Sequence, residues 1–310
     1  MITALAGGVG AARFLRGLVD VVPPGDVTAI VNTGDDVVLH GLHVSPDLDT
    51  VTYTLADSIN PETGWGLAGE SWRVMEELER LGGESWFRLG DRDLATHLYR
   101  TERLARGDGL SDVTASLALT FGVDVRLLPM SDDRVETRVV VEGEGEIGFQ
   151  DYFVGRQHSV PVTAVRFAGV SEARPGPGVL DAIRDADRVV VCPSNPIVSI
   201  GPILAVPGVR SAVEGVRDRV VAVSPIIAGA ALKGPADRML TELGHEASVV
   251  GVARLYAPLA RALVVDEADA ALAGAVEAEG MECIVTPTIM RGRVEAAALA
   301  RVVLDGRRAA

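Results

Sequence analysis

The chain has 310 residues, of which 48% are hydrophobic, 23% charged and only 4% aromatic. Its 43 acidic residues outnumber its 29 basic ones, so the formal net charge is −14. This composition excludes a disordered chain, and the acidity argues against a nucleic-acid binder or a protein that docks on an anionic membrane.

No apolar run reaches the roughly 18 residues that a membrane-spanning helix needs. The first residues lack the basic start and the long apolar run of a signal peptide. Two cysteines, Cys192 and Cys283, are too few for a disulfide framework in a chain of this length. We therefore expect a soluble, cytoplasmic protein with one large domain or two unequal ones.

The chain opens with the pattern of a parallel α/β sheet. Residues 2–6 form a short apolar run that predicts a buried strand, and residues 11–22 carry apolar positions at helical spacing. Residues 27–32 predict a second strand. The order strand, glycine turn, helix, strand is typical of the start of such a sheet.

The turn between the first strand and the first helix contains Gly7, Gly8 and Gly10. Glycines permit positive φ and let a phosphate approach the backbone N–H groups at a helix N-terminus. Arg13 stands where a dinucleotide-binding fingerprint has its third glycine, and the Gly-Lys-Ser/Thr of a Walker loop is also missing. We interpret the turn as a phosphate or nucleotide site, with a purely structural tight turn as the alternative.

Polar residues follow the second strand, at the edge of a parallel sheet where ligands bind. Asn32 and Thr33 could bond a phosphate or a ribose, and the carboxylates of Asp35 and Asp36 could hold a divalent cation. A polar turn that caps a helix would use the same residues.

A second acid pair, Asp47 and Asp49, follows Pro46 where a helix is predicted to start. A carboxylate in the first turn stabilises a helix, which accounts for one of the two. It does not account for four acids close together near strand ends. The pattern indicates a magnesium site or a base that faces a polar substrate, with the candidates Asp35, Asp36, Asp47 and Asp49.

Residues 69–122 differ from the rest of the chain because three helical patterns follow one another there. Asp91 or Asp93 and Ser111 are the predicted N-caps of the second and third helices. A short strand candidate lies at 86–89. We predict that this segment is a helical insertion.

The alternation of strands and helices then resumes. Apolar, valine-rich runs predict strands at 125–129, 137–142, 162–167, 188–192, 220–224, 262–266 and 282–286. Helical patterns fall at 178–186, 236–244, 267–279 and 293–305. Continuous valine runs suit strands buried on both faces. We therefore predict an α/β fold, a Rossmann-like parallel sheet with helices on both faces, formed by residues 1–68 and 123–310.

Two later loops carry residues able to bind a phosphate. Ser194 and Asn195 follow the strand at 188–192 in a loop stiffened by prolines, which suits a phosphate or a nucleobase as well as an ordinary tight loop. Lys233, the one lysine of the chain, lies in a loop beyond the strand at 220–224. An ammonium binds phosphate as a point charge, although one lysine can also survive by chance in an arginine-rich sequence.

Two further features are interpreted as structural. His40 and His43 could suggest zinc, but no third or fourth ligand of a suitable type is near them in the sequence. Cys192 falls in a strand pattern, so we expect it to be buried rather than to act as a nucleophile.

Six motifs together resemble the 2-phospho-L-lactate transferase family, which is also called CofD-like. In chain order they are LAGGVGAARF, VNTGDD, HGLHVSPDLDT, NPETGWGL, CPSNPIVSIGPIL and SPIIAGAALKGPAD. Each motif is modest, but their joint order and spacing are specific. The resemblance spans essentially the whole chain and implies a Rossmann-like sheet with a helical insertion.

The resemblance implies a transferase of coenzyme F420 biosynthesis. In this reaction the terminal ribityl hydroxyl of the deazaflavin Fo attacks the acid-bearing phosphate of a guanosine diphosphate-linked donor, GMP leaves, and magnesium is required. The donor acid is phospholactate in one branch and phosphoenolpyruvate in another, and the arginine-rich composition leans toward the second. Family members form homodimers.

The resemblance also implies roles for single residues. Asp49, together with Arg88 in WFRLGD, matches the acidic and basic residues with which the family contacts the deazaflavin. Some relatives have lysine at the position of Arg88. Asp47 and Asp49 are the candidates for the catalytic base, and the metal ligands are implied to come from the four acids named above.

The donor site is implied by other motifs. The glycine turn at 7–10 and the loop of Ser194 and Asn195 lie where the family binds its guanylyl diphosphate donor. Lys233 falls within a further family motif. Asn32 and Thr33 complete the predicted substrate-binding residues.

Two other functions stay open. A related branch of the superfamily comprises regulatory proteins that bind UDP-sugars and also open with a glycine turn and an acid-rich second loop. Those proteins usually carry Asp-Gly-Gly-Ser where this chain has Gly34, Asp35 and Asp36, and they lack a match to PDLDT. A nicotinamide-dependent dehydrogenase is suggested by the glycine turn alone, without the third glycine or a clear ribose-binding acid.

Overall fold

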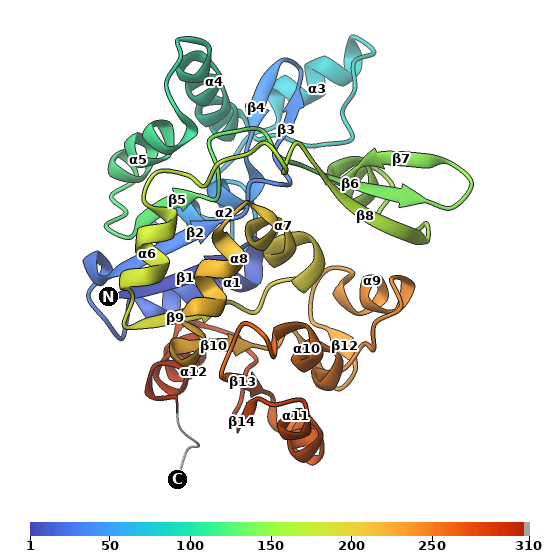
Figure 1. Ribbon diagram of the computed structural model, residues 1–310. Helices are drawn as coiled ribbons and strands as arrows, with labels where there is room; N and C mark the ends of the chain where they lie inside the picture. Colours follow the sequence, from blue (N-terminus) through green and yellow to red (C-terminus); the bar gives the residue numbers. More distant parts are fainter. Residues whose placement is uncertain (307–310) are drawn as a thin grey trace.

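The computed structural model describes residues 1–306, and Figure 1 shows how their elements are arranged. The centre is a seven-stranded sheet in which every neighbouring pair of strands is parallel. Across the sheet its strands are β14 (Glu282–Val285), β13 (Ala262–Val265), β10 (Val220–Val223), β9 (Arg188–Val191), β1 (Ile2–Ala6), β2 (Val27–Val31) and β5 (Arg126–Pro129). The predicted Rossmann-like α/β fold is confirmed.

The central strands are buried on both faces, as their continuous apolar runs predict. In β1, Leu5 joins the core on one face, while Ala4 and Ala6 join the core on the other. In β9, Val189 and Val190 divide in the same way. Successive side chains of a strand point to opposite faces, so one valine run contributes to two cores.

Helices cover both faces of the sheet. One face packs against α1 (Gly8–Leu18), α2 (Pro46–Leu55), α5 (Leu110–Thr120) and α12 (Arg293–Asp305). The other packs against α6 (Val179–Asp185), α7 (Gly201–Ala205), α8 (Val209–Gly215), α9 (Ala236–Glu242), α10 (Val249–Tyr256) and α11 (Ala273–Ala278). Short helical turns lie at η1 (Pro24–Asp26), η2 (Asp151–Gly155), η3 (Pro196–Ile200), η4 (Arg217–Arg219) and η5 (Glu267–Leu272).

The order of the strands places a topological switch point in the middle of the sheet. From β1 the chain winds outward through β2 to β5, and it later returns to the other side of β1 and winds outward through β9, β10, β13 and β14. The loops that leave β1 and β9 therefore turn to opposite sides. In doubly wound sheets, ligands bind in the crevice at this switch point.

A second, smaller sheet lies beside the main one, and Figure 1 shows it projecting to the right. Its antiparallel strands are β7 (Gly145–Gly148), β6 (Glu136–Val141) and β8 (Val162–Ala168). The runs at 137–142 and 162–167 are thus strands as predicted, but they do not extend the parallel sheet. Two hairpins complete the strands, β3 (Val37–Leu39) with β4 (Leu42–Val44) and β11 (Ile226–Ile227) with β12 (Ala230–Ala231).

The predicted helices of residues 69–122 are present as α3 (Arg73–Arg80), α4 (Asp91–Ala105) and α5. The strand predicted at 86–89 is wrong, because those residues form no strand. The division into a core and an insertion stays a prediction.

The caps of these helices differ from the predicted ones. Asp91 accepts hydrogen bonds from the backbone N–H groups of Arg73 and Val74, so it caps α3 rather than its own helix. Glu70 in turn accepts from the N–H groups of Arg92 and Asp93 at the start of α4. The two helix starts therefore cap each other, which no local cap pattern reveals.

The cap of α5 also comes from a distant residue. The helix begins at Leu110, and the carboxylate of Asp132 accepts hydrogen bonds of 2.7 Å from both the N–H and the hydroxyl of Ser111. Ser111 is thus inside the first turn and is not the predicted N-cap.

Among residues 1–306, no single helix is long and apolar enough to cross a membrane. One pair of helices broken by a 95° bend, Pro196–Ala205 with Val209–Gly215, passes the same test by length and composition.

Candidate active site

The loops after β1 and β9 are joined at the switch point of the sheet. The hydroxyl of Ser194 donates to the carbonyl oxygen of Gly7 at 2.8 Å and accepts from the Gly7 N–H at 3.3 Å. A Cβ on Gly10 would overlap the carbonyl oxygen of Pro193, so only glycine lets the two loops approach this closely. The sequence-predicted glycine turn and serine loop therefore form one continuous surface at the switch point of the sheet.

Asp47 lies against this glycine turn. It follows Pro46 in the first turn of α2, and its Oδ2 is 2.9 Å from the place where a Cβ on Gly7 would stand. The backbone N–H of Gly8 hydrogen-bonds the Asp47 carboxylate. The N-terminus of α1, which we predicted to face an anion, thus faces a carboxylate of the chain itself.

Asn32 joins two of the predicted acids. Its amide nitrogen donates to Asp35 at 3.1 Å and to Asp47 at 3.0 Å, while its amide oxygen accepts from the N–H of Gly34 at 2.8 Å. Asn32 is fully buried. Both ends of its amide are therefore engaged by the protein, and its predicted contact with substrate stays a prediction.

Asp35 and Asp36 carry buried carboxylate oxygens that lack a hydrogen-bond donor. Ser45 donates to one oxygen of Asp36 at 2.6 Å, but the Oδ1 atoms of Asp35 and Asp36 have no partner among the described residues. Burial raises the pKa of both carboxyls, and the charge of Asp47 raises the pKa of Asp35 further. Burial also raises the pKa of Asp47 to about 6, against the hydrogen bond from Asn32.

These three acids offer the oxygen ligands that magnesium prefers, although the one group of ligand atoms found within 4.8 Å of one another in the described residues is that of Asp49, Asp93 and His97. A buried carboxylate oxygen without a partner is costly, and a hard cation with a preference for oxygen ligands would satisfy it. The hydrogen bonds that Asp35 and Asp47 receive within the described residues come from neutral groups. Because these donors carry no charge, they do not neutralise the two carboxylates. Asp35 and Asp47, together with Asp36, could therefore hold a divalent cation.

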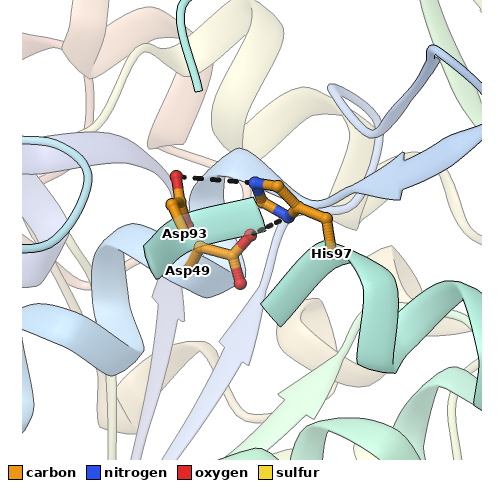
Figure 2. Close-up of side chains that lie close together, drawn as sticks. All are labelled: Asp49, Asp93 and His97. Carbon is orange, nitrogen blue, oxygen red and sulfur yellow. Dashed lines mark ion pairs between the residues drawn. The ribbon is translucent and has the colours of Figure 1, made fainter. Parts of the chain in front are cut away.

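Asp49, the fourth predicted acid, has different neighbours, which come from α4. Its Oδ1 accepts a hydrogen bond from Nη2 of Arg100, and its Oδ2 lies 3.7 Å from Nδ1 of His97. His97 Nε2 lies 3.4 Å from a carboxylate oxygen of Asp93. Figure 2 shows the imidazole of His97 between the carboxylates of Asp49 and Asp93.

Tyr53 completes this buried network by donating its hydroxyl to Asp93 at 2.6 Å. Burial opposes ionisation of Asp93, but the hydrogen bond and charge of His97 outweigh it and lower the pKa of this carboxyl. Burial raises the pKa of Asp49, while the Arg100 charge acts in the opposite direction. The sequence analysis missed all members of the network except Asp49 as site residues. The spacing of 93, 97 and 100 on one face of α4 was the signal that could have found them.

A cavity of about 180 Å³ borders the acid cluster. Its lining includes Asp35, Asp36, Trp86, Thr137, Arg138 and Gln150. Gln150 donates from its side chain to the backbone oxygen of Asp35 at 3.0 Å, which ties the small sheet to the loop after β2. A larger cavity of about 320 Å³ between α6 and α8 includes none of the predicted site residues.

Lys233 lies near the glycine turn, although more than two hundred residues separate them in sequence. A Cβ on Gly64 would stand 3.4 Å from Nζ of Lys233 and 3.8 Å from a methyl group of Val9. Lys233 is exposed, and no ion pair of this lysine is found in the described part of the chain. Its charge is therefore available to an anion at the crevice.

Arg88 lies on an aromatic surface rather than against Asp49. Its guanidinium is 4.9 Å from the ring of Trp72, which packs edge-on against Trp65 with ring centres 6.2 Å apart. Within residues 1–306 no hydrogen bond or ion pair joins Arg88 to Asp49. The predicted pairing of these two residues around one substrate stays a prediction.

Three other sequence-predicted residues lie in structural positions. Asn195 accepts from the N–H groups of Ile197 and Val198 and so caps η3. Thr33 is buried beside the acids. Cys192 is buried and has a free thiol, as expected.

Comparisons with known proteins show the family and agree with the fold. The family model for the 2-phospho-L-lactate transferase CofD matches residues 2–289. A phosphoenolpyruvate transferase of Streptomyces griseus is 50% identical over 309 residues, with 98% of this chain and 97% of the relative covered. One from Mycolicibacterium smegmatis is 42% identical, with 98% of each covered. A solved structure from Bacillus halodurans, at 18% identity and 98% coverage of both chains, shares the fold with a TM-score of 0.64.

Proposed function

Because this chain belongs to the CofD family, we propose that it transfers a phosphoenolpyruvyl group to the deazaflavin Fo in coenzyme F420 biosynthesis. The observation that best supports this proposal is the similarity to phosphoenolpyruvate transferases, which reaches 50% identity over nearly the whole chain. The sequence motifs alone leave phospholactate open as the donor acid. The relatives' names favour the enolpyruvyl donor.

The proposed reaction makes one phosphate–oxygen bond and breaks another. The terminal ribityl hydroxyl of Fo attacks the phosphorus that bears the enolpyruvyl group, and the bond from that phosphorus to the bridging oxygen breaks. GMP leaves with the electron pair, and the hydroxyl proton passes to a carboxylate of the protein. Such a transfer needs in-line positioning and neutralised phosphate charge more than covalent help.

The guanosine diphosphate end of the donor is proposed to lie over the joined loops after β1 and β9, at the switch point of the sheet. At Gly8 a Cβ would meet only an oxygen of Asp47, 3.9 Å away, so there is space beside the start of α1 at this residue, and Ser194 holds the neighbouring loop in place. Lys233 carries a free positive charge near the same turn. A lysine ammonium is well suited to a phosphate because it acts as a compact point charge.

We propose that Asp35, Asp36 and Asp47 hold a magnesium ion, whose chemistry is to neutralise charge on the transferring phosphate. The residues support this because two of them have buried oxygens without a donor. Asn32 holds Asp35 and Asp47 side by side through its amide nitrogen.

Asp49 is proposed as the base that receives the hydroxyl proton. Its Oδ2 is buried and free of hydrogen bonds, and Arg100 fixes its other oxygen. Arg88 and the neighbouring tryptophans are proposed to contact the acceptor. We expect Asp49→Asn to lower kcat by about 10²–10⁴-fold with little change in donor KM, because general-base help contributes that much. A folded variant with unchanged turnover would contradict this role.

The function is tested by an assay of the purified protein with Fo, magnesium and each candidate donor, in which mass spectrometry identifies the product. We expect the dehydro product from the enolpyruvyl donor, with GMP released in equal amount. A phospholactyl product alone would replace the donor assignment. No product from any donor, together with thermal stabilisation by a UDP-sugar, would replace the function.

We propose a homodimer as the working form, as the family resemblance implies. Light scattering behind size-exclusion chromatography measures the mass directly. A mass near the 32.5 kDa of one chain would contradict the dimer.

A further inference from the structure

We propose that Arg100 is a positioning residue, which fixes Asp49 beside the acceptor and separates it from the acids that hold the metal. The inference rests on the proposed function, and it assigns different roles to acids that the sequence presents as one group. Asp49 would act on the hydroxyl, while Asp35, Asp36 and Asp47 would hold the cation; of these three, Asp36 is also under the influence of the Arg100 charge.

The first step is the way Arg100 itself is held. It lies on α4 with only 1% of its surface exposed. One nitrogen of its guanidinium donates to Asp49, and another donates to the backbone oxygen of His43 and lies 3.2 Å from Nδ1 of His97. A planar guanidinium held at both of these nitrogens has little freedom to rotate. Its Asp49 partner is therefore held in one orientation.

The second step excludes a metal site formed by Asp49, Asp93 and His97. Suitable ligand atoms of Asp49, Asp93 and His97 lie within 4.8 Å of one another, so their spacing alone would suit a metal ion. The guanidinium of Arg100 contacts two of the three, and a second cation beside it would be repelled. Tyr53 also occupies one oxygen of Asp93. Arg100 and Tyr53 thus already take one oxygen each of the two carboxylates.

The third step is the state of the Asp49 carboxylate. Arg100 takes Oδ1, and Oδ2 is left buried without a hydrogen-bond donor. This oxygen faces Nδ1 of His97 at 3.7 Å, and it is the Asp49 atom left to accept a proton from an acceptor hydroxyl. By contrast, Asp35 and Asp47 share the neutral amide of Asn32 and have no hydrogen-bonding cation in the described part of the chain.

A double-mutant cycle tests the positioning role. We expect Arg100→Gln to lower kcat by about 10²-fold, since a misplacement of about 1 Å costs that much. In an Asp49→Asn background the same change should lower kcat by no more than about twofold, because the group being positioned is gone. Equal losses in the two backgrounds would overturn the positioning role.

Two further variants keep the result of this test interpretable, one as a fallback for folding and one as a control. Arg100→Lys retains the charge and should fold if the glutamine variant does not. Its kcat should lie between those of the wild type and Arg100→Gln, and its donor KM should be unchanged. Arg103→Gln is the matched control, because Arg103 lies one turn along α4 and pairs with Asp108 instead. Its kcat should equal that of the wild type. A wild-type kcat in folded Arg100→Lys and Arg100→Gln would overturn the proposal.

Binding of Mn²⁺, measured by electron paramagnetic resonance without substrates, tests the division of the acids apart from turnover. Asp47→Asn should weaken binding by at least about tenfold. Asp49→Asn and Arg100→Lys should leave it within about threefold. Equal weakening by Asp47→Asn and Asp49→Asn would overturn the division. If the variants show this division but the wild type forms no product from any donor, the proposed function alone is overturned.

Discussion

Asp47 and Asp49 are only two residues apart, yet their surroundings are opposite. Asp47 receives hydrogen bonds from Asn32 and the N–H of Gly8, which are neutral donors. Asp49 is paired with the permanent charge of Arg100. In the proposed assignment, these different environments make Asp47 a ligand of the cation and Asp49 the acceptor of the proton. The sequence predicts that these acids gather, but not their roles, because Arg100 lies fifty residues further along.

The ionisation of Asp47 should be visible as a pH dependence of stability in metal-free protein. Its pKa is raised from 3.8 to about 6 by burial, so the native state binds this proton more tightly than the unfolded state. Stability from this group is present at low pH and falls as pH rises from about 4 to about 6. Urea unfolding of wild type and Asp47→Asn across this range measures the difference. Parallel curves for the two proteins would contradict the assignment.

Gly10 should tolerate no side chain. The Cβ of Gly10→Ala would overlap the Pro193 carbonyl oxygen, so the loop after β9 must move. We expect a loss of about 1–3 kcal/mol in the free energy of unfolding, with weaker donor binding. Gly25→Ala is the control, because nothing lies within 4 Å of its new methyl group. Equal melting temperatures for the two variants would show that the contact is easily relieved.

Among the elements, the strands of the main sheet were well predicted because their apolar runs are short and continuous. The strands β6 and β8 were also found, but their place in a separate antiparallel sheet was not. The burial of β6 alternates along the strand, which is typical of a strand with one covered face. Charged residues such as Arg138 interrupt its valines, and this alternation was the available signal.

The helices α7, α8 and α10 were missed for different reasons. The segment that forms α7 and α8 contains Pro202, Pro207 and several small residues, a composition that favours a loop. For α10 the start signal was present, since Ser248 accepts from the N–H groups of Val250 and Gly251. A serine before an apolar run was readable as an N-cap.

This cap provides a prediction at the scale of one element. Ser248→Ala should lower the free energy of unfolding by about 1 kcal/mol, because two N–H groups lose their acceptor. Ser248→Thr keeps an acceptor and should cost less. Chemical unfolding of the three proteins measures the order, and kcat should stay unchanged because α10 packs on the sheet away from the acids. Alanine and threonine variants of equal stability would contradict the cap.

For the molecule as a whole, the net charge of −14 conceals an uneven distribution. Asp35, Asp47, Asp49 and Asp93 are buried, while ion pairs such as Arg80–Glu77 and Arg106–Glu102 are at the surface. Surface pairs of this kind contribute about 0–1 kcal/mol each. The buried acids therefore affect the stability of the fold more strongly than the surface charge does.

Magnesium should consequently stabilise the whole fold. A ligand that binds only the native state at 100 times its Kd adds about 2.7 kcal/mol to the free energy of unfolding. Thermal melting with and without Mg²⁺ measures this gain in wild type. Asp47→Asn should lose most of it, and Arg103→Gln should keep it. A melting temperature that does not respond to Mg²⁺ would argue against a metal site in the free enzyme.

The network of Asp49, His97 and Arg100 also bears on how this enzyme can change over evolution. The glycine turn and the serine loop belong to the sheet, whereas the groups that orient Asp49 come from α4. With the proposed roles, donor recognition and the orientation of the base thus depend on separate stretches of chain. A chimera that receives residues 69–122 from a relative would exchange the orientation of the base while it keeps its own nucleotide crevice. Acceptor chemistry could then diverge without renewed adaptation of the donor site.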